Sequence, residues 1–229
     1  MKSFLRALCY LLLFFASGIQ ATQFDSMLEQ LSNTGIVQTR EIILPDFPGA
    51  FNPSLISYGD GFLLSFRFAK GRPGVVENSL RIRDSFIGVV KLDKELNLLE
   101  EPAQILDIAS YSPDMSITVK DARLFDANGQ IFIIFNDIPS FFAHGNSIYL
   151  GELIEENGMF VLKESAKRLN YPFARPIEKN WTPLVFDGKF YVIYSEQPRV
   201  VLEVDADTGN CREVSRLPLN WNWNFGEIR

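Results

Sequence analysis

The chain has 229 residues, 47% of them hydrophobic, and a formal net charge of −6 at pH 7. This acidic balance argues against nucleic acid or an anionic membrane as a partner and leaves a neutral ligand such as a sugar open. The sequence contains one histidine, His144, in a predicted turn, and two cysteines, Cys9 and Cys211. A His-rich zinc site is therefore excluded and a histidine-dependent catalytic triad is disfavoured, so we expect neither a metal nor a cofactor.

The first 21 residues have the order of features that is typical of a cleaved export signal. Lys2 and Arg6 precede the apolar run Ala7–Ala16, and Ile19-Gln20-Ala21 provides a site with a small final residue. The apolar run is shorter than the roughly 20 residues that a membrane-spanning helix needs. We therefore predict a secreted or periplasmic protein without stable membrane insertion after cleavage. An uncleaved signal that anchors the protein in a membrane is the alternative.

The remaining chain has the length of one domain. We predict a signal peptide over 1–21, an N-terminal lead-in segment over 22–44 and a repeated β region over 45–229. One short helix is expected at Asp25–Leu31. Beyond it, short runs rich in Val, Ile, Phe and Tyr alternate with Asp-Gly, Asn-Gly and Pro signals, which is typical of many short strands. With Cys9 removed, Cys211 has no partner for an internal disulfide.

Three stretches share one hairpin pattern, which consists of a short apolar strand, a tight turn and a longer apolar strand. The turns are predicted at Asp60-Gly61, Asn128-Gly129 and Asp187-Gly188, and the first strands align on Leu55, Leu124 and Leu184. Two further strands are expected after each hairpin, at 86–92 and 105–108, at 147–153 and 159–163, and at 199–204 and 212–216.

Four strands in every repeat of 60–70 residues is the pattern of β-propeller blades. The predicted fold class is therefore all-β, a β-propeller with about three blades in this chain. Apolar runs such as Ile131–Phe135 suit strands that neighbouring blades bury on both faces. A β-sandwich with an accidental internal similarity is the alternative.

Polar residues stand where the innermost strand of each unit begins. They are Asn52 in the first unit, Asp121 and Arg123 in the second, and Glu178, Lys179, Asn180 and Trp181 in the third. Because equivalent strands of a propeller surround one axis, we expect these residues to converge in one polar cavity.

The chemistry of these residues suggests a role for each. Asp121 is the best candidate for a catalytic acid or base, and Glu178 for the second carboxylate that glycoside hydrolysis usually needs. Arg123 and Lys179 are candidates for binding an anion such as phosphate. Trp181 is a candidate for stacking on a sugar ring. A structural ion-pair network at the channel mouth is the alternative.

At these residues the chain resembles the five-bladed β-propeller glycosidase superfamily, and in particular its β-mannoside phosphorylases and related hydrolases. The family's Asn-Pro motif resembles Asn52-Pro53-Ser54, its Glu-Asp-Pro-Arg motif resembles Lys120-Asp121-Ala122-Arg123, and its Lys-Asn motif resembles Glu178-Lys179-Asn180-Trp181. Lys120 and Ala122 stand where the family has Glu and Pro. The resemblance covers roughly residues 45–215.

The resemblance implies a glycoside hydrolase or phosphorylase acting on a β-linked glycan, with mannose-containing glycans among the candidates. It implies that Asp121 donates a proton and that Arg123 and Lys179 contact phosphate or substrate. The expected partners are therefore carbohydrate and inorganic phosphate. Two alternatives remain, a non-catalytic secreted propeller that binds glycan or protein, and a truncated, inactive remnant, because only three of five expected blades are visible.

Overall fold

The computed structural model describes residues 41–69, 85–111, 118–137 and 145–218. The fold described below belongs to the unit that begins at Ile43. The predicted export signal, the predicted helix at Asp25–Leu31 and His144 lie outside the described residues. Within the described ranges, no helix is long and apolar enough to cross a membrane.

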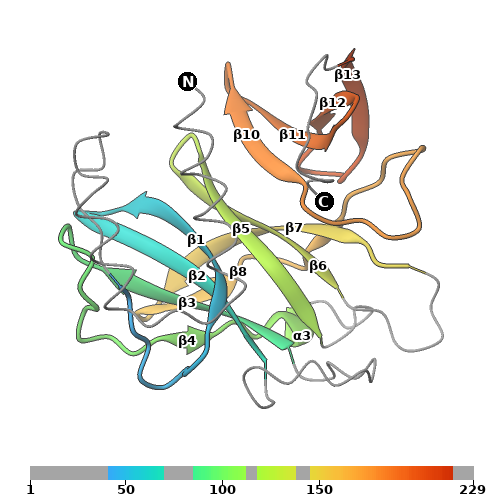
Figure 1. The fold of residues 1–229 in the computed structure, drawn as a ribbon. Helices are drawn as coiled ribbons and strands as arrows, with labels where there is room; N and C mark the ends of the chain where they lie inside the picture. Colours follow the sequence, from blue (N-terminus) through green and yellow to red (C-terminus); the bar gives the residue numbers. More distant parts are fainter. Residues whose placement is uncertain (1–40, 70–84, 112–117, 138–144, 219–229) are drawn as a thin grey trace, which may run out of the picture. The chain divides into compact units, whose positions relative to one another are not determined.

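The described chain forms three antiparallel sheets whose strands follow one another in sequence order (Figure 1). The first sheet contains β1 (Phe51–Tyr58), β2 (Gly61–Ala69), β3 (Ser85–Leu92) and β4 (Gln104–Ile105). The second contains β5 (Val119–Ala127), β6 (Gln130–Asp137), β7 (Ile148–Glu156) and β8 (Met159–Leu162), with β9 (Lys167–Arg168) also paired to β7. The third contains β10 (Thr182–Phe186), β11 (Lys189–Glu196), β12 (Arg199–Val204) and β13 (Cys211–Leu217).

These sheets confirm the predicted all-β fold with three repeated units. A single helical turn, α3 (Ile108–Tyr111), follows the first sheet. The short strand β9 was not predicted from the sequence, because its two residues carry no apolar pattern. It makes the second sheet five-stranded.

The innermost hairpins close with two-residue turns. Asn128-Gly129 and Asp187-Gly188 have positive φ at both residues, which is what a type I′ turn requires. In the first hairpin the turn residues are Gly59-Asp60, so the predicted Asp60-Gly61 turn was wrong by one residue. Gly59 supplies the positive φ of 55° there, and Gly61 already belongs to β2.

The third unit also differs from the predicted alignment by one residue. Counted back from the end of each innermost strand, Pro183 and not Leu184 corresponds to Leu55 and Leu124. β10 tolerates this proline because it is an edge strand with a partner on one side only.

The core consists of two apolar clusters, one on each face of the second sheet. Ile133 packs with Leu63 of the first sheet, and its neighbour Ile134 packs with Val192 of the third. All four side chains are at most 2% exposed. Alternate residues of Ile131–Phe135 thus enter different clusters, which confirms that this strand is buried on both faces.

Candidate functional site

Three polar residues occupy equivalent positions in the three units. Asn52, Asp121 and Asn180 each lie six residues before the last residue of β1, β5 and β10. Each has a positive φ, of 50°, 55° and 62° respectively. Asn and Asp enter this left-handed region more readily than other residues with a side chain. The shared conformation means that the three units present these side chains in the same local geometry.

A β-bulge creates this conformation in the first two units. In β5 the register shifts between Lys120 and Arg123, so that Asp121 and Ala122 together oppose the single residue Phe135. The same shift occurs in β1 around Asn52. A bulge leaves the extra residue outside the ladder and redirects its side chain. The bulge therefore frees Asp121 from regular pairing at the point where the strand begins.

Asp121 is held by residues of the first sheet. Its Oδ1 accepts a hydrogen bond from Asn52 Nδ2 at 2.5 Å and one from Arg67 Nη1 at 3.1 Å. Arg67 is 7% exposed, its Nε donates to Ser85 Oγ at 2.7 Å, and its guanidinium lies over the Phe51 ring at 4.9 Å. The strand starts of the first two units therefore meet at Asp121.

The second carboxylate oxygen of Asp121 remains available. Within the described part of the chain, Oδ2 has no hydrogen-bond donor, and the Asp121 side chain is 26% exposed. Arg67 and Asn52 both donate to Oδ1 and leave Oδ2 without a hydrogen bond. An oxygen in this position is suited to accept a hydrogen bond from a ligand hydroxyl.

Glu178 is placed differently. It is 6% exposed, its Oε1 accepts from Tyr194 Oη at 2.9 Å and from the Arg175 backbone N–H, and its Oε2 accepts from Trp181 Nε1 at 2.8 Å. Burial, followed by the hydrogen bond to Glu178, raises the pKa of Tyr194 to about 12. Both oxygens of Glu178 are therefore occupied by groups of its own chain, which fits a carboxylate that fixes the segment leading into β10.

The Trp181 ring is covered. It is 3% exposed, belongs to the core cluster between the second and third sheets, and contacts Tyr194 edge to face with centroids 5.2 Å apart. Stacking on a sugar requires an open ring face. The expected stacking role of Trp181 does not fit this geometry, which instead makes it a core residue anchored through Glu178.

The cationic residues remain open to solvent. Arg123, Lys179 and Asn180 are exposed, and among the described residues none of their side chains has an ion pair or hydrogen bond. Lys120 is half-buried, and this burial lowers its pKa, while the nearby Asp121 raises it and Arg67 and Lys179 lower it further. Lys179 is therefore close enough to Lys120 for its positive charge to lower the pKa of Lys120.

Sequence reasoning missed Arg67 and Lys120 as members of the site. Arg67 lies near the end of β2, and only its pairing with Phe51 across the sheet brings it beside Asp121. Lys120 appeared in the sequence only as a departure from a family motif. The register partner of Lys120 across the sheet is Asn136, and Asn136 donates a hydrogen bond to the Glu178 carbonyl at 3.2 Å. Lys120 therefore lies on the face of the sheet that is directed toward the third unit.

A cavity of about 250 Å³ lies elsewhere, at the hairpin turns of the second and third units. Its walls include Phe125, Phe132, Phe190, Lys189 and Glu203, and none of the predicted site residues. Among the described residues, no group of three or more His, Cys, Asp or Glu side chains is placed to hold a metal ion.

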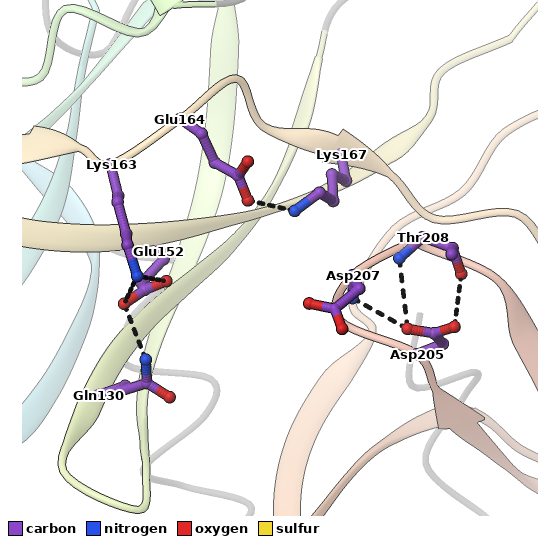
Figure 2. A network of polar contacts seen from close by, with 8 residues as sticks. All are labelled: Gln130, Glu152, Lys163, Glu164, Lys167, Asp205, Asp207 and Thr208. Atoms are coloured by element: carbon purple, nitrogen blue, oxygen red, sulfur yellow. Dashed lines mark hydrogen bonds and ion pairs between the residues drawn. The ribbon is translucent and has the colours of Figure 1, made fainter.

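The polar contacts in Figure 2 also lie away from the strand starts. Glu152 accepts hydrogen bonds from Gln130 at 3.0 Å and from Lys163 at 3.0 Å, and Asp205 accepts from Thr208 Oγ1 at 2.7 Å and from the backbone of Asp207. Exposed pairs of this kind contribute about 0–1 kcal/mol each. They stabilise the surface and turns and offer no reactive group.

Comparisons with known proteins place the fold. The sequence matches no protein-family model and no curated protein. Among solved structures, the chain is similar to the β-xylosidase RS223, with a TM-score of 0.52 and 12% identity over 78% of this chain and 61% of that one. A thermostable family-43 glycoside hydrolase has a TM-score of 0.49, with 16% identity over 72% of this chain and 54% of the other. Zg3597, a family 117 glycoside hydrolase of Zobellia galactanivorans, has a TM-score of 0.48, with 13% identity over 75% and 56%.

At this level of identity the likeness to the β-xylosidase shows the fold. The chain has a β-propeller fold of the type found in glycoside hydrolases, as the repeat predicted. It spans about three-fifths of the length of the β-xylosidase. A closer relation to β-mannoside phosphorylases stays a prediction.

Proposed function

We propose that this chain is an exported, carbohydrate-active protein that takes a β-linked glycan at the strand starts around Asp121. The observation that carries this proposal is the open Oδ2 of Asp121, at a bulge where the first two units meet. The propeller fold supports the choice of ligand class, because the similar β-xylosidase is named for its action on a glycoside. Export rests on the order of residues 1–21.

Asp121 is the residue that we place in contact with the sugar. Arg67 and Asn52 both donate to its Oδ1, which suits a charged carboxylate that accepts a hydrogen bond or a proton through Oδ2. This arrangement favours a role as base or as transition-state stabiliser over the proton-donor role that the family resemblance implied.

Glycan binding without turnover is the second candidate function. Hydrolysis of a glycoside usually requires two carboxylates on opposite sides of the scissile bond. Glu178, the expected second carboxylate, is buried with both oxygens engaged, and Asn52 supplies an amide at the position equivalent to Asp121. These observations favour a binding protein if no turnover is found.

The finer expectations concern the sugar and a possible co-substrate. Arg123 and Lys179 are exposed and without ion pairs in the described structure, which supports anion binding at this edge. Phosphorolysis and a preference for mannosides remain proposals.

Turnover of 4-nitrophenyl β-mannoside, β-xyloside and β-galactoside, each with and without inorganic phosphate, tests the function. We expect Asp121→Asn to lower turnover by roughly 100-fold or more, the scale of a lost catalytic acid or base. Asp60→Asn, at an exposed turn, is the matched control and should leave turnover unchanged. Binding that needs Asp121 but proceeds without turnover would establish the second candidate, and no binding to any β-glycoside would refute both.

A further inference from the structure

Positive charge accumulates beside Asp121. The chain as a whole is acidic, with a net charge of −6. At the strand starts, however, Arg67 pairs with Asp121, and Lys120 lies close enough to Arg67, Asp121 and Lys179 for each of their charges to affect its pKa. Oδ1 of Asp121 pairs with Arg67 at 3.1 Å. Among the described residues neither Lys120 nor Lys179 forms an ion pair, although Asp121 and Asp137 lie near enough to favour the charged form of Lys120.

Lys120 is directed toward this region by the bulge in β5. The shift between Lys120 and Arg123 puts both residues on one face of the sheet, because their register partners are Asn136 and Ile134, which lie on the same side. Ile134 belongs to the cluster shared with the third unit. The ammonium of Lys120 therefore faces the third unit, on which Lys179 stands.

A half-buried lysine without a direct ion pair is an unfavourable arrangement for the isolated protein. Burial penalises the charged ammonium, and neighbouring cations add repulsion. Asp137, the other carboxylate close enough to affect Lys120, is 9% exposed and accepts a hydrogen bond from the Ser147 backbone N–H at 2.8 Å. An anionic group on a ligand would supply the direct ion pair that neither Asp121 nor Asp137 makes with Lys120.

We propose that Lys120, together with Lys179, binds the carboxylate of a uronic acid, so that the site selects acidic glycans over neutral ones. This inference rests on the proposed function and deepens it by naming the substrate class. The sugar ring would lie against Asp121 Oδ2, and its carboxylate would lie between the two ammonium groups.

The same two cations would also attract free inorganic phosphate, so the test must separate an anion on the sugar from an anion in solution. 4-Nitrophenyl β-glucuronide and 4-nitrophenyl β-glucoside form a matched pair of probes that differ only in a carboxylate against a hydroxymethyl group. Isothermal titration of the full chain with each probe, and with inorganic phosphate alone, gives the three affinities directly.

We expect the glucuronide to bind at least about tenfold more tightly than the glucoside, as a charge-assisted hydrogen bond predicts. Lys120→Met should bring the ratio of the two affinities close to one, and Lys120→Arg should restore the preference because it keeps the charge. Lys94→Met, at an exposed turn lysine, is the control and should leave the ratio unchanged.

Three other outcomes of the titration would contradict the inference. Equal or tighter binding of the glucoside would overturn the inference and leave the proposed function standing. Tight binding of phosphate alone, with no preference between the two glycosides, would assign the cations to a free anion and also overturn it. Failure to bind either glycoside would refute the proposed function and the inference together. A melting temperature for each variant shows that it is folded.

Discussion

At the scale of single residues, Arg67 organises the candidate site. It joins Ser85 and Asp121 while almost wholly buried, so that its charge is balanced inside the protein. Removing one partner of a buried pair leaves the other uncompensated. The sequence predicted Asn52 and Asp121, because they begin repeated strands, but Arg67 joins them only through strand pairing.

Arg67→Met should therefore lower the free energy of unfolding by about 2 kcal/mol, between the cost of a lost surface pair and that of a lost buried one. Urea unfolding measures this value. Arg123→Met is the matched control, since Arg123 is exposed and without a partner in the described structure, and should change it by less than about 0.5 kcal/mol. Equal effects of the two substitutions would contradict the role of Arg67.

Tyr194 gives a prediction on pH. Its pKa is raised to about 12, first by burial and then by Glu178, so the folded state favours the neutral phenol. The stabilisation is complete below the ordinary tyrosine pKa of about 10 and is lost as the pH rises toward 12.

Tyr194→Phe should therefore reduce the loss of stability between pH 10 and pH 12, which urea unfolding at several pH values measures. Tyr191→Phe serves as a control, because Tyr191 is half-buried but, within the described ranges, has no hydrogen bond to a carboxylate. An identical pH profile for wild type and Tyr194→Phe would show that Tyr194 does not titrate in this way.

At the scale of elements, the bulges near the starts of β1 and β5 determine what the site presents. The hydrophobic pattern predicted the strands to within a few residues, because alternation and turn signals are local properties. A bulge depends on the register with the neighbouring strand, and the sequence therefore did not show that Lys120 and Arg123 share a face. The same limit explains the one-residue errors at Gly59-Asp60 and Pro183.

The positive φ of Asn180, 62°, can be tested by substitution. Asn180→Gly should keep or slightly raise stability, since glycine adopts this conformation without strain. Asn180→Ala should lower the free energy of unfolding by about 1 kcal/mol because the Cβ of alanine is unfavourable there. Thermal unfolding of the Asn180→Gly and Asn180→Ala variants measures the difference in stability. A more stable alanine variant would contradict the left-handed conformation of Asn180.

At the scale of the whole described fold, the second sheet is the common layer of two cores. The sequence repeat predicted three units, and the continuous apolar run Ile131–Phe135 predicted the burial of β6 on both faces. They did not identify Trp181 as a core residue, since its place beside polar neighbours suggested a ligand role.

If the two clusters form one cooperative unit, Leu63→Ala in the first and Val192→Ala in the second should lower the same single unfolding transition. The side chains of Leu63 and Val192 are both completely buried. The leucine substitution should therefore lower the free energy of unfolding by about 2–5 kcal/mol. Calorimetry measures both, with the exposed Leu99→Ala as the control. Two separate transitions in either variant would mean that the sheets unfold independently.

The central claim is that the strand starts around Asp121 form the ligand site. A crystal structure of the chain soaked with a β-linked oligosaccharide tests it most directly. We predict a sugar hydroxyl within hydrogen-bond distance of Asp121 Oδ2, with Arg67 still bound to Oδ1. A sugar seated in the cavity lined by Phe125 and Phe190, with nothing bound at Asp121, would contradict the claim.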